Sequence, residues 1–357
     1  MIVADIVRLR VDEEYADPRY LTYAINSPDV CDELAEKTKG TTRPRVNLGH
    51  IRSLPIPVAP LNEQKRIADK LDAILVRVDA CRERLDRVPA ILKRFRQAVL
   101  AAATSGKLTE EWRSSDDLTE WQKVRLDEIC HSITDGDHQA PPQADSGIPF
   151  ITISAINDGR LRLEKATRFV PSSYFEQLKP ERRPNPGDVL FSVTGSIGIP
   201  AIIDTEKPFT FQRHIAILKP NRARISSGYL LLALGTENIR QQALTVATGI
   251  AQLTIPLSGL RSFVIDLPTP AEQEEITRRV EALFTYADHL EARYTTTRAQ
   301  VERLTPALLS KAFRGELGPQ DPNDEPASVL LERIREERKI SIKTSKRAVK
   351  PRRKTSC

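Results

Sequence analysis

Four short polar segments carry the side chains and glycines that could do chemistry in this chain. Residues 133–142 and 193–198 contain glycines, which let the backbone come close to another molecule. Residues 212–214 and 248–252 add amide and guanidinium groups, and glutamine and arginine can pair bidentately with the edges of adenine and guanine. These residue types predict a surface that binds through hydrogen bonds, although each segment is also compatible with an ordinary turn. The candidate binding residues are Thr134, Asp135, Gly136, His138, Thr194, Gly195, Ser196, Gln212, Arg213, Gly249 and Gln252.

Catalytic motifs are missing from the sequence. It has no GxxxxGK[ST] phosphate loop, no GxGxxG segment after a strand and no HExxH pair. Neither the five histidines nor the four cysteines have the spacing of a metal site, a catalytic triad or a disulfide framework. We therefore expect binding rather than catalysis, with no metal and no cofactor held by this chain.

The charge of the chain is concentrated at its C-terminal end. The net charge is +6 with a pI near 9.1, but seven basic residues lie in an acid-free tail that starts at Ser341. Outside this tail the chain has 47 basic and 48 acidic residues. A nucleic-acid-binding surface outside the tail would therefore have to arise from local clustering of basic residues. The sequence has no run of eighteen apolar residues and no signal-peptide layout, which predicts a cytoplasmic protein.

The elements that would position the polar segments are organised by an internal repeat. Residues recur without a gap at an offset of 209 positions, a period that indicates a duplicated domain pair rather than a solenoid. The matching pairs include Tyr20 and Tyr229, Gly40 and Gly249, Arg52 and Arg261, Glu63 and Glu272, Gln64 and Gln273, and Gly106 and Gly315.

Each copy contains a heptad pattern that predicts a long helix with a narrow apolar seam. Two such seams most simply pack on each other, but the pattern alone leaves the polarity of the pair open. Pro89 and Pro306 predict a kink or a short break, while Gly106 and Gly315 are placed to end the helices. The predicted seam residues are Ile67, Leu71, Ile74, Val78, Leu85, Leu92, Ile276, Val280, Leu283, Leu290, Val301 and Leu304.

Between the two helices the pattern changes to short β-rich runs separated by turn signals, followed by a predicted helix over residues 227–246. This part predicts a mixed α/β domain. Residues 1–57 match only the last third of that domain, with an expected strand over residues 2–9 and a helix over residues 18–37. Such a fragment would expose unpaired strand edges.

Several segments together resemble the specificity subunit of type I restriction-modification systems. Residues 54–67 (LPIPVAPLNEQKRI), with their repeat at 266–276, precede the long helices, and residues 309–317 (LSKAFRGEL) follow the second one. Residues 121–129 (WQKVRLDEI) look like the start of a target recognition domain. The domains implied are a remnant of a first recognition domain (1–57), a spacer helix (58–108), a complete second recognition domain (117–268), a second spacer helix (269–317) and a C-terminal helix with a basic tail (318–357).

The resemblance implies a non-catalytic reader of double-stranded DNA. In this family an antiparallel pair of helices separates two recognition domains, each of which contacts half of a bipartite target. The helices dock two methyltransferase subunits, which use S-adenosylmethionine to methylate adenine N6, and motor-nuclease subunits can join them. We therefore expect the α/β class, with recognition domains and an antiparallel coiled coil.

The N-terminal segment departs from the family pattern, and three explanations stay open. A separate chain completes the first recognition domain, two copies of this chain assemble, or the system has decayed. A coiled-coil scaffold without a sequence-reading role is the alternative function. The target bases and the spacer length are not predicted by the sequence.

Overall fold

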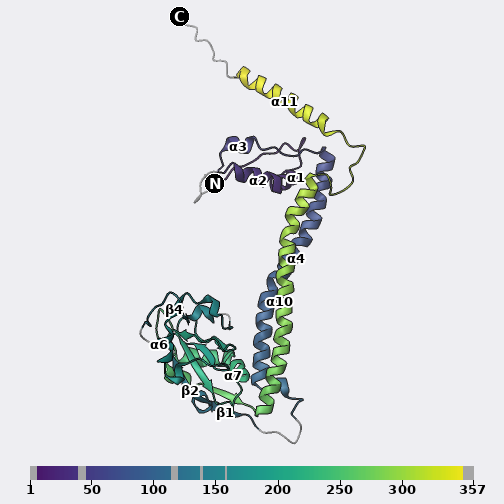
Figure 1. The fold of residues 1–357 in the computed structure, drawn as a ribbon. Helices are drawn as coiled ribbons and strands as arrows, with labels where there is room; N and C mark the ends of the chain where they lie inside the picture. The colour runs from purple at the N-terminus through teal and green to yellow at the C-terminus, as the bar shows by residue number, and fades with distance from the viewer. Residues whose placement is uncertain (1–5, 39–45, 114–119, 137–139, 157–158, 349–357) are drawn as a thin grey trace. The chain divides into compact units, whose positions relative to one another are not determined.

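The computed structural model describes residues 6–38, 46–113, 120–136, 140–156 and 159–348 (Figure 1). The chain divides into two compact units. Unit 1 contains Met1–Val88 and Ala292–Cys357, and unit 2 contains Pro89–Glu291. Two 44-residue helices, α4 (Leu61–Thr104) and α10 (Pro270–Phe313), each contribute one part to unit 1 and the other part to unit 2. Among the described residues, no helix is both long enough and apolar enough to cross a membrane.

Unit 2 is built on three small sheets. The largest has four antiparallel strands in the order β2-β8-β5-β6. A second has the order β4-β3-β7, with β3 and β7 parallel, and a third pairs β1 with β9. The strands are β1 (Gln122–Arg125), β2 (Cys130–Asp135), β3 (Ile148–Ile151), β4 (Arg168–Val170), β5 (Val189–Ser192), β6 (Pro200–Ile202), β7 (Thr210–Phe211), β8 (Ile215–Pro220) and β9 (Val264–Leu267).

The four-stranded sheet separates two apolar cores because β5 and β8 are buried on both faces. Phe191 and Leu218 lie in the core shared with the long helices, whereas Leu190 and Ile217 lie in the core shared with β3 and β7. Side chains alternate between the faces of a strand, so neighbouring residues stabilise different cores. The sheet is therefore held from both sides, which fixes the loops at its ends.

The helices of unit 2 are α5 (Leu126–Ile129), α6 (Ser172–Glu176), α7 (Ser227–Leu234), α8 (Glu237–Val246) and α9 (Leu257–Arg261), and the short 3-10 turns are at Ile153–Ala155, Leu163–Lys165 and Pro180–Arg182. The single helix predicted over 227–246 is wrong. It is two helices, because Thr236 leaves helical geometry and its hydroxyl accepts a hydrogen bond from the Ile239 amide to start α8.

The N-terminal part of unit 1 repeats the last helices of unit 2. It contains α1 (Pro18–Ile25), α2 (Pro28–Glu36) and α3 (Leu48–Arg52), which match α7, α8 and α9 at the offset of 209 residues. The single helix predicted over 18–37 is therefore also wrong, since Ser27 starts a new helix ahead of Pro28. A 3-10 turn at Lys107–Thr109 follows α4 in unit 2, and α11 (Ala327–Ala348) follows α10 in unit 1.

The strand predicted over residues 2–9 is not found in its described part. Residues 6–10 have no strand geometry, and Ile6 and Leu9 are exposed; residues 2–5 lie outside the described part of the chain. The matching strand of unit 2, β8, bonds to β2 and β5 on its two sides. No described segment of unit 1 offers such a neighbour, and a strand needs a ladder partner to satisfy its backbone.

In each unit the same set of contacts holds the repeated short helices against a long helix. We call this set of contacts the joint of the unit. In unit 2 the buried amide of Gln273 accepts from the Ser226 N–H (2.7 Å) and donates to the carbonyls of Arg224 and Pro268 (3.0 Å each). The Tyr229 hydroxyl donates to the Asp266 carbonyl at 2.6 Å.

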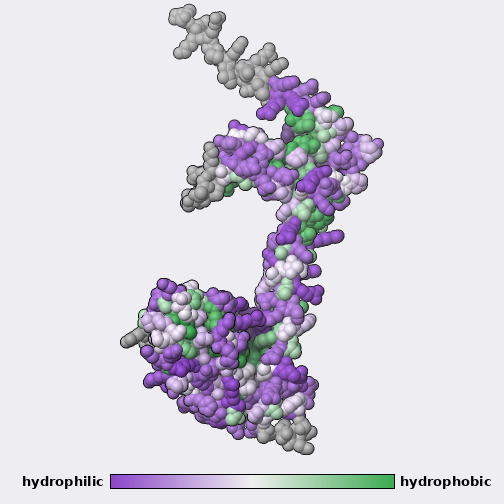
Figure 2. Space-filling model, viewed as in Figure 1, coloured by the Kyte–Doolittle hydropathy of each residue, from purple (hydrophilic) through white to green (hydrophobic). Residues whose placement is uncertain are grey.

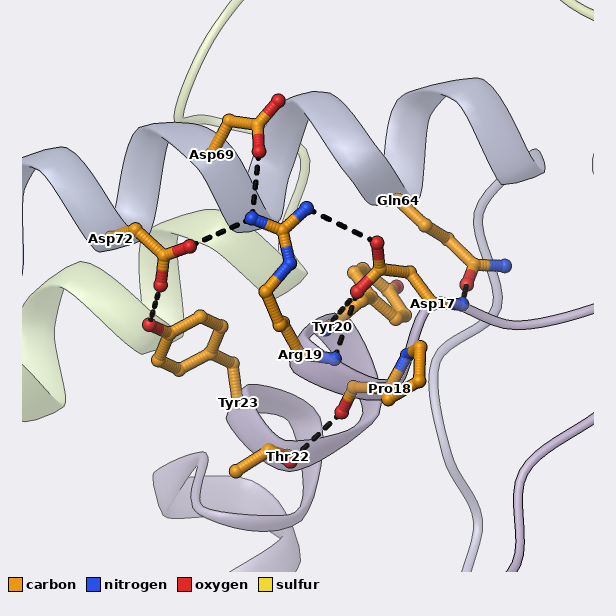
Figure 3. A network of polar contacts seen from close by, with 9 residues as sticks. All are labelled: Asp17, Pro18, Arg19, Tyr20, Thr22, Tyr23, Gln64, Asp69 and Asp72. Carbon is orange, nitrogen blue, oxygen red and sulfur yellow. Dashed lines mark hydrogen bonds and ion pairs between the residues drawn. The ribbon is translucent and has the colours of Figure 1, made fainter. Parts of the chain in front are cut away.

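The joint of unit 1 repeats these bonds atom for atom. Gln64 accepts from the Asp17 N–H at 2.9 Å (Figure 3). It donates to the carbonyls of Tyr15 (3.3 Å) and Ala59 (2.8 Å), and the Tyr20 hydroxyl donates to the Pro57 carbonyl (3.0 Å). Every partner is displaced by 209 residues from its counterpart in unit 2. The repeated Gln is thus the residue that ties each helical segment to its long helix.

The long helices pair antiparallel in each unit. In unit 2, Arg96 bonds to Asp288 (2.7 Å) and Glu291 (2.8 Å), while Thr109, in the 3-10 turn that follows α4, donates to Glu272 near the start of α10. In unit 1, Arg82 donates to Thr305 (2.9 Å), and Arg298 bonds to Asp86 (2.6 Å). The predicted antiparallel coiled coil is therefore present. Figure 2 shows hydrophobic residues on the surface of the helix pair of unit 1. Leu71 of α4 forms a buried cluster with Leu309 and Ala312 of α10.

Eleven of the twelve predicted seam residues are buried or half-buried, and Leu304 is the exception. Leu304 is 43% exposed, and Thr305 with Leu308 takes its place toward the partner helix. A straight helix has 3.6 residues per turn, so a strict heptad drifts around its surface. Of the kink or short break predicted at Pro89 and Pro306, the break is absent, because both helices run on through their proline. Each proline removes one backbone hydrogen bond of its helix. Packing along the partner helix offsets this loss. Gly106 and Gly315 end the helices with φ of 75° and 76°, as predicted.

Candidate nucleic-acid interface

Segments far apart in the sequence meet at one end of the four-stranded sheet of unit 2. The end of β2 packs against the connection between β7 and β8, with the Gly136 N–H donating to the Ile215 carbonyl at 3.3 Å. A Cβ on Gly136 would lie 2.1 Å from the Phe211 carbonyl oxygen. Only glycine fits here, so Gly136 acts by letting two backbones come together.

The turn after β5 packs against the loop after α8 in the same way. The Gly195 N–H donates to the Leu253 carbonyl (3.0 Å), and the Ile255 N–H donates to the Val193 carbonyl (2.7 Å). Gly195 and Gly249 have φ of 77° and 101°, which a residue with a side chain rarely adopts. These glycines shape the loops, and neighbouring residues supply the polar side chains.

The four predicted segments border one open cavity of about 470 Å³. Each contributes at least one predicted binding residue to its lining. The lining residues are Asp135, Val193, Thr194, Arg213, His214, Gln252, Thr254, Ile255, Pro256 and Leu257.

Two of these side chains are free for a ligand. Arg213 and Gln252 are exposed, and neither makes a side-chain hydrogen bond or ion pair within the described residues. Asp135 and Thr194 are buried at the bottom of the cavity. The cavity therefore combines a guanidinium and an amide, which are donor groups suited to base edges or phosphates, with a recessed carboxylate.

The electrostatic setting keeps His214 neutral near pH 7. Burial lowers the pKa of the His214 imidazole, and the nearby Arg213 charge lowers it further. A neutral imidazole offers one donor and one acceptor, so His214 can hydrogen-bond within the cavity without adding charge. The positive charge of this lining therefore comes from Arg213.

Other predicted residues lie beside the cavity rather than in it. Thr134 donates from its hydroxyl to the Glu181 carbonyl (3.2 Å) and borders a second cavity of about 580 Å³. Ser196 is exposed on the turn after β5, and the Gln212 N–H bonds to the Ile151 carbonyl. His138 lies outside the described residues.

The second cavity contains basic residues that the sequence reasoning missed. Lys179 and Arg182 line it together with Tyr174 and Thr134. Thr134 and Asp135 are consecutive in β2, so this strand contributes one residue to each cavity. Residues 179–183 (KPERR) form a local basic run, and this run is the sequence feature that could have predicted them. Basic side chains beside a polar cavity are suited to phosphates flanking a bound base.

Comparison with known proteins identifies the family. A model of the type I restriction modification DNA specificity domain matches residues 4–89 and 119–300. The chain belongs to this family. It is 31% identical to the EcoBI specificity subunit of Escherichia coli, over 94% of this chain and 75% of that subunit. It is 35% identical to the EcoKI specificity subunit of Escherichia coli strain K12, over 80% of this chain and 64% of that subunit.

Solved structures of the specificity family share the fold. One, from a study of complex assembly and conformational transition of the type I R-M system, has a TM-score of 0.68 at 26% identity, covering 86% of this chain and 74% of its own. The HsdS subunit from Thermoanaerobacter tengcongensis has a TM-score of 0.56 at 25% identity, over 86% and 73%. These matches confirm the predicted mixed α/β class with paired long helices and the role of a DNA sequence-specificity subunit.

Proposed function

We propose that unit 2 reads part of a bipartite double-stranded DNA target through the cavity between its four loops. The observation that carries this proposal is the convergence of Asp135, Thr194, Arg213 and Gln252, from four separate segments, on one open cavity. Arg213 and Gln252 would bond to base edges, and Lys179 and Arg182 would contact flanking phosphates. The chain itself would carry out no catalysis and would hold no cofactor.

We also propose that the long helices dock methyltransferase subunits. Each half of the helix pair exposes large apolar side chains, which supports a protein partner. In unit 1 these are Val76 (69% exposed) and Leu304, and in unit 2 they are Ile91 and Tyr286. S-adenosylmethionine would bind to the partner that methylates adenine, and motor-nuclease subunits would be further members of the complex.

Mapping the methylated sequence tests the reading function. The full chain is combined with its methyltransferase, and N6-methyladenine is mapped for wild type, Arg213→Ala and Gln252→Ala. Each substitution should relax the preference at one position of the target, with a loss of about tenfold in affinity for the preferred sequence. Arg240→Ala is the matched control, because Arg240 lies on α8 outside the cavity and pairs with Glu237.

The outcomes separate a reader from a scaffold. A relaxed position in the Arg213 and Gln252 variants, with an unchanged target for Arg240→Ala, supports the cavity as the reading site. An unchanged target in all three variants means that the cavity does not read bases. Thermal unfolding of each variant shows whether a loss of binding comes from unfolding instead.

A further inference from the structure

The most exposed large apolar side chain of unit 2 lies next to the candidate interface. Ile250 is fully exposed (106%) in the loop between α8 and α9, two residues before Gln252. The other exposed large apolar side chains in the described part of this unit are between 37% and 59% exposed. Single exposed apolar residues are common on protein surfaces, so the setting of Ile250 decides its meaning.

The loop that carries Ile250 is held firmly at its base. Thr248 and Thr254 exchange two backbone hydrogen bonds of 2.8 Å, which close the loop. The Leu253 carbonyl is bonded to Gly195, and Thr254 bridges to Thr194 of the turn after β5. Ile250 is thus presented to solvent by a closed loop anchored to the sheet, and not by a free chain end.

The base of the same loop forms part of the cavity. Gln252 and Thr254 line it with Arg213 and Thr194. Gly249 lies directly before Ile250 with φ of 101°, and a Cβ there would meet the Gln252 carbonyl oxygen at 2.3 Å. The turn that this glycine permits sends Ile250 outward while Gln252 stays at the cavity. A ligand that reaches Gln252 from solvent would therefore also meet Ile250.

We propose that Ile250 is a specificity-determining residue that contacts the 5-methyl group of a thymine in the major groove. This inference rests on the proposed function of the cavity. Arg213 and Gln252 can satisfy donors and acceptors on bases, but the thymine methyl is the apolar group that base edges offer in that groove. Contact with it removes both the methyl and the Ile250 side chain from water, which favours binding without any charge.

A selection experiment with two DNA libraries tests this contact. The full chain with its methyltransferase selects from a randomised duplex library made with thymine and from the same library made with uracil, which lacks the methyl group. Wild type should prefer thymine at one position, and uracil there should weaken binding by about fourfold, as expected for one buried methyl group. Ile250→Ser should bind the thymine target about as weakly as wild type binds uracil, and it should no longer distinguish the two bases. Ile250→Leu should retain the distinction.

The controls identify which proposal fails. Salt dependence of binding should be equal for wild type and Ile250→Ser, because Ile250 neutralises no phosphate. If wild type selects no sequence from either library, the reading function fails and the inference fails with it. If wild type selects a sequence but Ile250→Ser selects the same one and still distinguishes thymine from uracil, the inference alone is overturned. A serine variant that loses affinity for both bases equally also overturns it.

Discussion

The two joints use the same backbone bonds but are stabilised by different side chains. In unit 2, Glu272 is buried and accepts from Thr109 (2.6 Å) and from the indole N–H of Trp121 (3.0 Å), with Arg113 at 3.4 Å. Its counterpart in unit 1, Glu63, is partly exposed beside a cavity of about 210 Å³. Glu63 makes no hydrogen bond or ion pair within the described residues.

Helix packing differs between the joints as well. In unit 2, Gly228 of α7 lies so close to α10 that a Cβ would be 2.9 Å from the Thr277 methyl carbon. In unit 1 the equivalent residue is Arg19, which bonds to the buried N-cap residue Asp17 and to Asp69 and Asp72 on the surface of α4 (Figure 3). Unit 2 therefore relies on close packing and a buried acid, whereas unit 1 relies on partly exposed charges. A repeated backbone arrangement can be kept while its supporting interactions are exchanged.

The largest effect should come from the shared glutamines. Gln64→Ala and Gln273→Ala each leave two carbonyls and one N–H without their partner, at a cost of about 3 kcal/mol in the free energy of unfolding of the unit concerned. Hydrogen exchange should increase in α1 for the first variant and in α7 for the second. Gln241→Ala, at an exposed position of α8, is the control and should change neither. If only one of the two glutamines matters, the joints are not equivalent.

Replacing the two equivalent glutamates should destabilise the two units to different extents. Glu272→Gln weakens charged hydrogen bonds to a buried group and should cost about 2 kcal/mol, with faster exchange around α10 in unit 2. Glu63→Gln should change the unfolding free energy by less than about 0.5 kcal/mol, because Glu63 has no bond to lose. Equal costs in urea unfolding would contradict the contrast drawn between these two acids.

The close contact between Gly228 and Thr277 predicts a smaller loss of stability, which a second substitution should reverse. Gly228→Ala should cost about 1 kcal/mol, since overpacking against Thr277 outweighs the better helix propensity of alanine. Thr277→Ser removes the opposing methyl carbon and keeps the hydroxyl that bonds to the Gln273 carbonyl (2.8 Å). The double variant should recover the wild-type midpoint in thermal unfolding. A double variant as unstable as Gly228→Ala would show that this contact is not the cause.

The smallest effect should come from salt acting on the charges of unit 1. Raising the salt concentration from about 0.1 M to 1 M should loosen α1 by less than about 1 kcal/mol, because Arg19 is 46% exposed. Hydrogen exchange in α7 should not respond, and Arg19→Ala should remove the salt dependence of α1. An equal response of α1 and α7 would count against the distinction.

Lowering the pH should also destabilise α1, through protonation of the Asp17 carboxylate. Burial raises the pKa of the Asp17 carboxyl, but bonds from the Arg19 side chain and from the Tyr20 and Arg19 amides bring it below its usual value. The stabilisation of the folded state by the ionised Asp17 carboxyl is therefore fully present above the unfolded aspartate pKa of about 4. It is lost as the pH falls through the lower pKa of the folded state. The Ser226 hydroxyl at the matching cap does not titrate there, so exchange in α1 should rise at acid pH before exchange at the start of α7.

Local and periodic features were readable from the sequence. The offset of 209 residues located both joints, the heptads located both long helices, and Gly106 and Gly315 located their ends. The four polar segments singled out in the sequence meet at one cavity, and their role in binding DNA stays a prediction. Interruptions were missed at Ser27, which precedes a proline at the first position of α2, and at Thr236, whose hydroxyl caps α8.

Tertiary structure decided how the matching residues act. The repeat marks Glu63 and Glu272 as equals, yet only Glu272 is buried among donors, and these come from residues 109–121 of a separate segment. Likewise, Ile250 is one more apolar residue in the sequence, and only the anchoring of its loop to Thr194 and Gly195 turns it toward solvent beside Gln252. Sequence by itself determined the elements, because helix periodicity and glycine conformation are local. The structure decided burial and partnership, because both depend on side chains that are brought together from distant positions in the chain.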